Sequence, residues 1–561
     1  MNPAIKSYLV KILHTVFFVF LFMEASSQAR QDSMRTIEII RARSLREIQI
    51  DSLTDLTMLA GDAVVKQGNT ILSGDSIVLN KRTGVAEVFG NVHINDADSV
   101  HTYANYLRYL GRERIAFLKK NVRLTDGKGT LITDDLEYNL ATGIANYKNG
   151  GQVVNGKTVL TSADAVYYSD TKDVYFKKYV HLTDPKYDII ADSLLYNTEF
   201  KTATFIAPTR IKSKEGVMNT KSGTYNLETG EAVFYERSSY SDSAYSMTGD
   251  KMAFDEKSGV IQIENNGKLV DSVNNVTVLG NQILLDKNKK SFLATRKPVM
   301  ILYKKNDSTY VAADTLFSGL RKYDTVSKKT VISQDTLTRV TKINTSRDSM
   351  VNNKVTADDS TIQIAINNPG SKDSIRYFLA FHNVRIFNDS LQAVSDSLYY
   401  STEDSVFRLF YNPVFWNDKT QVSGDTMYLF TENQKPKRLY VFNNSLVVNK
   451  ANEGMYNQVG GRTLNGYFRE GGLDSIYVKG SPAESIYYTQ DDDSAYIGMN
   501  RSKGDRINIY FVNKELNKVK FINNVDGTLY PMRQIPADQR YLKFFEWKDK
   551  RRPKNKLELF E

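Results

Sequence analysis

The sequence of 561 residues contains no cysteine, and this absence removes several kinds of chemistry together. Disulfide bonds, thiolate metal sites and cysteine nucleophiles are excluded. The lipid-modified N-terminal cysteine of a bacterial lipoprotein is excluded as well. The chain must therefore be held together by backbone hydrogen bonds and apolar packing, for which its 41% of hydrophobic residues provide ample material.

Histidine is also scarce, with five residues in the whole sequence. His93 and His101 lie close together in the sequence but lack the spacing of a strong metal-binding motif, so we interpret them as ordinary surface or turn residues. No Gly-x-Ser-x-Gly elbow, phosphate-binding loop or dinucleotide-binding fingerprint occurs between a strand and a helix. The sequence therefore predicts no enzyme, no cofactor and no metal site.

Long apolar runs are missing everywhere except at the N-terminus. Lys6 and Lys11 accompany a short apolar run at 12–23, and the small residues at 25–27 suit cleavage before Gln28. The run is shorter than the about 20 residues that a membrane-spanning helix needs. We therefore predict that residues 1–27 are a signal peptide and that the protein is exported, with a retained membrane anchor as the alternative.

What the sequence does contain is a frame of about thirty residues that repeats along the chain. Two clear copies are TDDLEYNLATGIANY (133–147) and TKSGTYNLETGEAVFY (220–235). Apolar residues stand at the second and fourth positions after an anchor residue, most often aspartate, with a variable residue between them. This alternation is typical of a β-strand with one buried face, and no segment favours a long helix.

A turn follows the strand, as in NKRTG (80–84), and a second strand then returns, often with Gly, Asn or Pro where it can bend. The recurring aspartate is tempting as a catalytic or calcium-binding group. We interpret it as a structural residue that satisfies backbone donors at the start of the strand, because Asn105, Lys221 and Arg462 replace it. The sequence predicts an all-β protein built by stacking hairpins with bent strands.

A polar stretch with weak alternation interrupts the frame. We predict a first β-block at 40–319, a polar insertion or loop at 320–376, a second β-block at 377–535, and a basic tail at 536–561 that is either a short amphipathic segment or disordered. The net charge of +10 is interpreted as a soluble surface. Phosphate-bearing lipids, surface polysaccharides or a membrane surface are the alternative partners for these basic residues.

The repeated frame resembles a known family. Its copies LSGDSIVLNKRTGVAEVFGNVHI (72–94), ITDDLEYNLATGIANY (132–147) and MTGDKMAFDEKSGVIQI (247–263) are similar to the OstA-like domains of lipopolysaccharide transport. These domains occur in the periplasmic bridge protein, in its inner-membrane partner and in the periplasmic part of the outer-membrane translocon. The likeness is good over 59–303 and fainter over 377–531.

The resemblance implies an elongated, twisted β-jellyroll of two facing antiparallel sheets with an apolar interior groove. It also implies a non-catalytic periplasmic lipid-transfer protein that bridges the inner and outer membranes for lipopolysaccharide transport and outer-membrane assembly. The implied partners are lipopolysaccharide or a related glycolipid, the inner-membrane extraction complex and the outer-membrane translocon, with head-to-tail self-association through edge strands and no nucleic acid. The alternative is an exported structural or adhesive β-solenoid repeat protein.

The candidate lipid-binding residues are those that the frame directs inward, and a closed apolar core is the alternative role for the same set. Membrane association at either end of the protein also stays open. The inward residues are Ile77, Leu79, Leu107, Leu136, Tyr138, Val166, Tyr168, Leu194, Tyr196, Tyr225, Met252 and Phe254.

Overall fold

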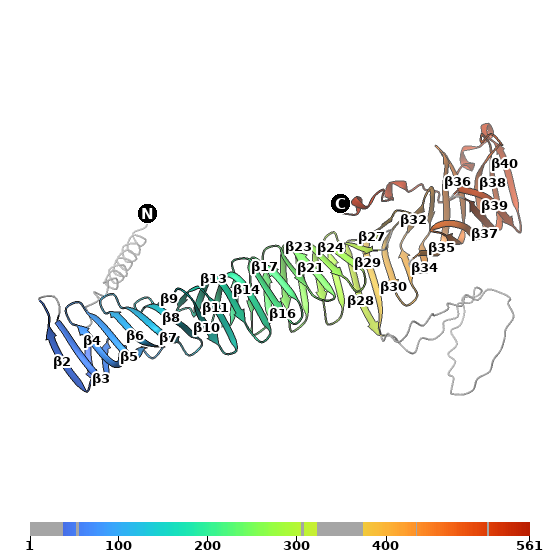
Figure 1. The fold of residues 1–561 in the computed structure, drawn as a ribbon. Helices are drawn as coiled ribbons and strands as arrows, with labels where there is room; N and C mark the ends of the chain where they lie inside the picture. Colours follow the sequence, from blue (N-terminus) through green and yellow to red (C-terminus); the bar gives the residue numbers. More distant parts are fainter. Residues whose placement is uncertain are drawn as a thin grey trace, which may run out of the picture. The chain divides into compact units, whose positions relative to one another are not determined.

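A computed structural model describes most of the chain, namely residues 37–51, 55–303, 308–322, 374–432, 435–512 and 515–560. The predicted signal peptide and most of the predicted insertion lie outside the described residues. The chain divides into two compact units, Met1–Glu228 (unit 1) and Thr229–Glu561 (unit 2). Both units consist of antiparallel strands that follow one another in chain order (Figure 1). The predicted all-β class is therefore confirmed.

The strands of unit 1 range from four to thirteen residues in length. They are β1 (Glu38–Arg41), β2 (Ser44–Gln49), β3 (Asp55–Gln67), β4 (Thr70–Asn80), β5 (Val85–Asp96), β6 (Val100–Leu110), β7 (Ile115–Thr125), β8 (Thr130–Asn139), β9 (Ile144–Tyr147), β10 (Gly151–Asn155), β11 (Thr158–Ser162), β12 (Asp164–Tyr168), β13 (Asp173–Thr183), β14 (Tyr187–Asn197), β15 (Thr202–Phe205), β16 (Thr209–Ser213), β17 (Val217–Thr220) and β18 (Gly223–Asn226).

Unit 2 continues the same pattern with longer strands near its end. Its strands are β19 (Glu231–Phe234), β20 (Ser238–Ser241), β21 (Tyr245–Gly249), β22 (Lys251–Asp255), β23 (Val260–Asp271), β24 (Val276–Asp286), β25 (Ser291–Thr295), β26 (Val299–Tyr303), β27 (Ser308–Ala312), β28 (Thr315–Lys322), β29 (Ser374–Asn388), β30 (Leu391–Ser401), β31 (Val406–Phe410), β32 (Val414–Asn417), β33 (Thr420–Ser423), β34 (Thr426–Glu432), β35 (Lys435–Asn452), β36 (Met455–Arg469), β37 (Gly472–Gln490), β38 (Tyr496–Val512), β39 (Glu515–Ile522) and β40 (Asp526–Pro531).

Four short 3₁₀-helices follow β40: η1 (Met532–Gln534), η2 (Ala537–Gln539), η3 (Asp549–Arg551) and η4 (Lys556–Leu559). Across the described ranges, no helix has the length and apolar character needed to cross a membrane.

Strands in both units bend sharply in the middle at a corner, which we define as two consecutive residues with positive φ. Gly90 and Asn91 form such a corner in β5, with φ of 65° and 44°, and the pairing of β5 with β6 skips them. Asn265 and Asn266 do the same in β23. Glycine and asparagine tolerate this left-handed conformation better than other residues, which explains their recurrence where the sequence predicts a bend.

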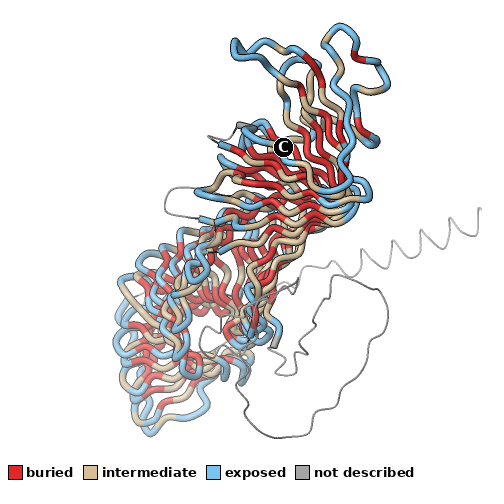
Figure 2. Tube along the Cα trace, turned by 90° about the vertical axis from the view of Figure 1, so that its right-hand side faces the viewer, coloured by how far each residue is buried: buried red, intermediate tan, exposed pale blue. Residues whose placement is uncertain are grey.

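Each corner divides a strand into two arms. In β5, arm A is 85–89 and arm B is 92–96, and both arms pair with the corresponding arms of β4 and β6. Inward side chains such as Val88 in arm A and Ile94 in arm B are fully buried. Figure 2 shows buried residues along the strands and exposed residues at the turns. The folded strands therefore form two facing sheets that enclose one apolar interior.

The turns that end arm A use the predicted asparagine and glycine chemistry. In the 139–143 turn, Asn139 Oδ1 accepts hydrogen bonds from the backbone N–H groups of Ala141 and Thr142. Gly143 closes the turn with φ of 68°, a conformation that side chains with a Cβ rarely adopt. The neighbouring arm begins at Ile144, so this turn fixes which residues of the next strand face inward.

The division into units does not follow the predicted block boundaries. The structure separates the units between Glu228 and Thr229, inside the predicted first block. The strands on either side of the predicted insertion, β28 and β29, pair directly with each other over eight residue pairs from Thr315↔Phe381 to Lys322↔Ser374. The stack of strands in unit 2 therefore continues across the insertion, because a long connection between paired strands does not interrupt their ladder.

The predicted basic tail is ordered and docks on unit 2. Residues 532–560, which we call the C-terminal strap, run back from β40 along the outer face of the arm B strands (Figure 1). Ile535 and Leu542 join Leu446, Val448 and other residues in one buried cluster. At the far end of the strap, Leu559 packs with Val299 and Phe387.

Three buried glutamines, on every second arm B strand from β30 to β36, hold the strap in place by hydrogen bonding. The Gln458 side chain donates to the Arg540 carbonyl and accepts from the Leu542 N–H, at 2.9 and 2.8 Å. Gln421 repeats this pair of bonds with the Glu546 carbonyl and the Lys548 N–H, both at 2.8 Å. Gln392 accepts from the Arg552 guanidinium. A side-chain amide that bonds both backbone groups of a strap segment also fixes the position of that segment.

Candidate functional site

The interior between the two arms is the candidate site, and most of the predicted residues lie in it. Nine of the twelve are buried: Ile77, Leu79, Leu107, Leu136, Tyr138, Leu194, Tyr196, Tyr225 and Met252. Their inward orientation is as predicted. Tyr138, Tyr196 and Tyr225 belong to one row of unit 1 that advances in steps of 29 residues, or twice that number.

Three predicted residues are placed differently. Phe254 is only partly buried and lies against the rings of Phe234 and Tyr240, with centroid separations of 5.7 and 5.4 Å. Val166 and Tyr168 do not face inward: Tyr168 is 38% exposed, whereas its neighbours Ala165 and Tyr167 are buried.

The misplacement on β12 is a shift of one residue. Tyr167 continues the row, 29 residues after Tyr138, and pairs with the inward Ala145. The aspartate that serves as anchor in the sequence, Asp164, comes one position too late, because Ala163 occupies the equivalent place at the corner. A shift of one residue reverses the face of every side chain in a strand.

The interior is filled by side chains. A cavity of about 10 Å³ in unit 1 is lined from arm B by Leu131 and Val153 and from arm A by Tyr167 and Val174, which confirms that the arms face each other. A cavity of about 20 Å³ lies between the arms of unit 2, beside Val459. Such volumes suit about one water molecule. Neither of these two cavities has room for an acyl chain.

The arms of unit 1 meet at their turns along a seam, which we call the mouth, and polar groups bridge it at regular intervals. Tyr109 donates to Gln67 at 2.6 Å, and Tyr138 donates to Asp96 at 3.2 Å. One repeat further on, Tyr167 donates to Asp126 at 2.5 Å. In each case an arm A tyrosine reaches a turn of arm B, so the row of tyrosines lines the interior and closes its opening.

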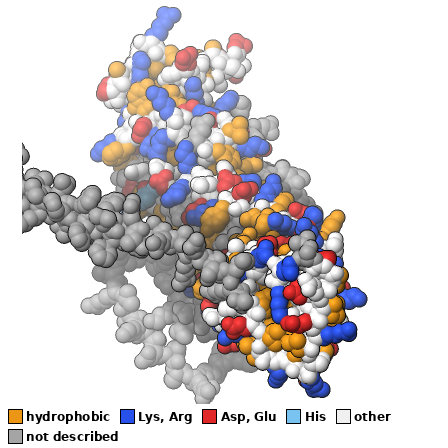
Figure 3. Space-filling view, turned by 90° about the vertical axis from the view of Figure 1, so that its left-hand side faces the viewer, with side chains coloured by type: hydrophobic (Ala, Val, Ile, Leu, Met, Phe, Trp, Pro, Cys, Tyr) orange, Lys and Arg blue, Asp and Glu red, His pale blue; other side chains and the backbone are white. Residues whose placement is uncertain are grey.

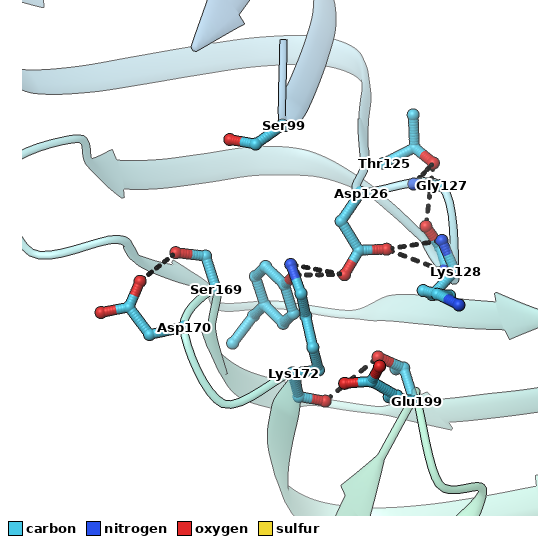
Figure 4. Close-up of polar contacts among 12 residues, drawn as sticks. Ser99, Thr125, Asp126, Gly127, Lys128, Ser169, Asp170, Lys172 and Glu199 are labelled. Carbon is cyan, nitrogen blue, oxygen red and sulfur yellow. Dashed lines mark hydrogen bonds and ion pairs between the residues drawn. The ribbon is translucent and has the colours of Figure 1, made fainter. Parts of the chain in front are cut away.

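Asp126 is the most elaborate of these bridges. Its carboxylate accepts from the backbone N–H groups of Lys128 and Gly129, both at 2.9 Å, within its own turn. The Lys172 ammonium of the facing turn lies 3.5 Å from the same carboxylate (Figure 4). The Asp126 side chain is 3% exposed. Burying a carboxylate costs desolvation free energy, which its hydrogen-bond and ion-pair partners offset. Removing one partner leaves the buried charge partly uncompensated and strongly destabilises the folded protein.

Titration behaviour follows from these contacts. Burial alone would raise the pKa of Asp126, but hydrogen bonds from Tyr167 and the turn backbone and the charge of Lys172 outweigh it and lower the pKa below its usual value. Burial and the neighbouring Asp126 raise the pKa of Tyr167 well above the ordinary range of tyrosine. The phenol therefore stays protonated and donates to an ionised carboxylate, which is the stronger type of hydrogen bond.

Unit 2 contains a bridge of the same composition. The Lys287 ammonium lies 3.0 Å from Asp242 and 3.2 Å from the Tyr240 hydroxyl. Burial opposes the charge on Lys287, but its bonds to Asp242 and Tyr240 raise its pKa above the usual value. Lysine, aspartate and tyrosine thus close the mouth in both units. Sequence analysis missed these residues because each lies in or beside a turn, where charged side chains are common.

The recurring aspartates lie on the outside of the corners, away from the interior. Asp75 accepts from the Asn91 amide at 2.9 and 3.2 Å, and Asp425 accepts from the Asn444 amide at 3.1 Å through both of its oxygens. These contacts support the structural interpretation of the aspartates. They correct its location, because the aspartates mark the bend in the middle of a strand and not its start.

The two histidines of β5 and β6 lie together on the outer face of arm B. His93 Nε2 is 3.1 Å from His101 Nδ1, and the His93 ring stacks on Tyr103 with a centroid separation of 4.5 Å. Burial, followed by the neighbouring His101, lowers the pKa of His93. Within the described residues, no group of three or more His, Asp and Glu side chains is arranged to hold a metal ion.

The first strands of unit 1 leave apolar side chains in solvent. Within the described ranges, β1 and β2 pair only with β3. Ile39, Ile40 and Leu45 are exposed there. Seen from this end, the surface carries apolar patches among charged side chains (Figure 3). Such an edge has backbone groups that can pair with a further strand.

Together these features define a class: an antiparallel stack of bent strands whose two arms enclose a continuous apolar interior within each unit. Comparison with known proteins narrows the class. Residues 35–192 match the family model described as OstA-like protein, the family that the sequence resembles. Corners of the same kind continue beyond the matched region, for example at Asn265–Asn266.

A search of curated proteins finds no match. Among solved structures, the chain is similar to LptH from Pseudomonas aeruginosa, described as the LptA-homologous periplasmic component of the conserved lipopolysaccharide transport device. The sequence identity is 15%, the match covers 30% of this chain and 80% of that chain, and the TM-score is 0.09.

Proposed function

We propose that the protein is a non-catalytic periplasmic carrier that binds the acyl chains of lipopolysaccharide or a related glycolipid between its two arms and bridges the inner and outer membranes. The observation that carries this proposal is the interior, which in unit 1 receives mostly apolar side chains from every repeat and is closed by polar bridges at the mouth. The OstA-like match over residues 35–192 supports the same class of function.

Loading requires the mouth to open. A hydrogen bond to a charged acceptor, such as that from Tyr167 to Asp126, contributes about 1.5–3 kcal/mol. Burying one methylene contributes about 0.8 kcal/mol, so a chain of about twelve methylenes contributes roughly 10 kcal/mol. Entry of one acyl chain therefore offsets the loss of several bridges. The sugar portion of the lipid stays at the mouth, in water.

The edge strands supply a means of contact with partner proteins. The exposed edge at β1 and β2 and the edge at β39 and β40 can each receive a strand from a neighbour, which is binding by β-augmentation. The proposed partners are the inner-membrane extraction complex, the outer-membrane translocon and further copies of this chain. Depletion of the protein, followed by locating newly made lipopolysaccharide, tests the bridging role: accumulation at the inner membrane is expected.

The filled interior favours a second candidate, an exported structural or adhesive repeat protein with a permanently closed core. The cavities of about 10 and 20 Å³ are the observation that supports it. The two candidates differ in whether the arms ever separate.

Site-specific photo-crosslinking distinguishes them. A photoreactive residue at Leu136 or Tyr138, both buried, is expected to capture glycolipid in cells, whereas one at the exposed Glu137 between them is not. The same contrast is expected between Tyr167 and its exposed neighbour Tyr168. Equal labelling of both faces, or no labelling at any buried position in a correctly folded protein, would reject the carrier and favour the closed core.

A further inference from the structure

The C-terminal strap has two chemically different faces. Its inner face, with Ile535, Leu542 and Leu559, is buried against unit 2. Its outer face carries large apolar side chains in solvent: Phe544 is 71% exposed and Leu557 is 66% exposed, with Tyr541 and Phe560 also exposed. Single exposed apolar residues are common on protein surfaces, but several on one short segment indicate an interaction site.

Basic residues surround these exposed apolar side chains. Residues 540–560 contain eight basic and three acidic residues, a net charge of +5. Lys543, Lys550 and Arg551 are exposed on the outer face of the strap. Aromatic and aliphatic side chains among lysines and arginines are typical of segments that lie at the interface of an anionic membrane.

Phe544 is held outward by the backbone. Its φ is 68°, in the left-handed region that a bulky residue rarely adopts. The nearby residues Leu542 and Phe545 turn toward the sheet and pack there, so Phe544 stays exposed at a cost in backbone strain, with the Lys543 ammonium 5.0 Å from its ring centroid. Strain of this kind persists at functional positions, where the surrounding structure fixes it.

The strap is also a rigid support for this surface. Gln421 and Gln458 bond its backbone on both sides of Phe544, at Arg540, Leu542, Glu546 and Lys548. A surface fixed in this way loses little conformational entropy when it binds, which distinguishes it from a free basic tail.

From these features we infer that the outer face of the C-terminal strap binds the surface of an anionic lipid bilayer. Phe544 and Leu557 insert at the level of the headgroups, and Lys543, Lys550 and Arg551 contact lipid phosphates. This inference goes beyond the proposed carriage of glycolipid and does not depend on it, because the strap lies on the outside of arm B and the carrier site lies between the arms.

The test is cosedimentation of the exported protein with vesicles made of equal parts phosphatidylglycerol and phosphatidylcholine, compared with phosphatidylcholine alone. Binding only to the anionic vesicles is expected. The triple variant Lys543→Glu, Lys550→Glu, Arg551→Glu is expected to bind about tenfold more weakly or worse. The double variant Phe544→Ser, Leu557→Ser is expected to lose a similar factor, because insertion of apolar side chains contributes as well.

A matched control uses the exposed aromatic and basic residues of unit 1. Tyr179 is 85% exposed, and Lys119 and Lys120 are exposed at another corner. Tyr179→Ser combined with Lys119→Glu and Lys120→Glu is expected to leave vesicle binding unchanged. Equal loss in this control would show that overall charge alone drives binding, and would overturn the inference.

Two further outcomes also reject the inference. One is full binding by the Phe544→Ser, Leu557→Ser variant. That result would show that apolar insertion contributes nothing and that binding is purely electrostatic, as it would be to any polyanion. The other is no preference of the unaltered protein for anionic vesicles. All five substituted side chains are exposed, so the variants are expected to keep unit 2 folded. Thermal unfolding of each variant checks this. No glycolipid is present in this assay, so its result is separate from that of the crosslinking test.

Discussion

The outer faces of arm B differ between the two units, although the inner faces are alike. In unit 1 the outer face is open to solvent and carries polar, charged and scattered apolar side chains, as where His181 contacts Asp188 and pairs with the exposed Ile190 across β13 and β14. In unit 2 the equivalent face carries Trp416, Val448 and Ile486, all fully buried. The difference is explained by the C-terminal strap, which covers part of the outer face of unit 2.

This comparison shows that one strand pattern serves two purposes. Where arm B has solvent on its outer side, its strands alternate between buried and exposed residues. Where the strap covers it, both faces are buried, as in β32 and β33, whose residues are all buried. A sandwich with one face in water thus becomes, in part of unit 2, a sheet buried on both sides, which is expected to be stiffer.

The largest test of the comparison is to remove the strap. A chain that ends after Pro531 exposes Trp416, Val448 and the three glutamines, and loses the burial of Ile535, Leu542 and Leu559. Each of these three side chains contributes about 1.5–3 kcal/mol. Unit 2 is expected to become protease-sensitive or to aggregate, while unit 1 keeps its protection. Hydrogen exchange followed by mass spectrometry measures both units in one sample.

A milder variant separates the contribution of hydrogen bonds to the strap from the contribution of its apolar packing. Gln421→Ala removes two hydrogen bonds to the strap and is expected to cost about 1–3 kcal/mol locally, seen as faster exchange of the Lys548 amide. Gln152→Ala, at an outward position of β10 in unit 1, is the matched control and is expected to have no such effect. Unchanged protection in Gln421→Ala would show that apolar packing alone holds the strap.

The next test concerns the mouth, where the units are alike. Tyr167→Phe removes the hydroxyl that donates to Asp126 and is expected to destabilise unit 1 by about 1.5–3 kcal/mol, without changing its core volume. The variant is also expected to exchange glycolipid faster, because one bridge fewer must open. Chemical unfolding of the variant and of the unaltered protein measures the first effect.

Acid sensitivity supplies an independent check of the same bridge. Because the pKa of Asp126 is lowered in the folded protein, its contribution to stability is complete above the unfolded pKa of about 3.9. That contribution is lost as the pH falls below about 4 toward the folded pKa. Asp126→Asn is expected to flatten this part of the stability profile. Asp135→Asn, on the exposed side of β8, serves as control, and equal flattening there would contradict the assignment.

Much of the fold could be predicted because its repeat carries a strong local signal. The alternation around Leu136 and Tyr138 and the asparagine turns set the strand faces correctly through most of unit 1. The error at Val166 and Tyr168 arose because an aspartate marked the frame, and at that repeat Ala163 holds the corner position while Asp164 follows it. Different residue types can occupy an exposed corner, whereas the spacing between inward residues is fixed. The spacing is therefore the better marker of the frame.

The strap and the mouth could not be predicted, since both depend on contacts between distant segments. A trace of the strap is nevertheless present in the sequence. The run PVFW at 413–416 and the run LQAV at 391–394 lack the alternation of the other strands, which indicates burial on both faces. The local sequence does not identify the segment that covers these two strands. The bridge between Asp126 and Lys172 joins turns 46 residues apart and leaves no such trace.

The smallest expected effect tests whether the corners of the two units are equivalent despite their different outer faces. Asn91 in unit 1 and Asn444 in unit 2 have φ of 44° and 46° and bond the same type of aspartate. Replacing either by alanine is expected to cost about 1 kcal/mol, because alanine tolerates the left-handed region poorly, and replacing either by glycine is expected to restore most of it. Thermal unfolding that resolves the two units measures both. If the alanine variant weakened unit 1 but not unit 2, the strap would be holding the corner as well as the sheet, and the two units would differ in their bends and not only in what covers them.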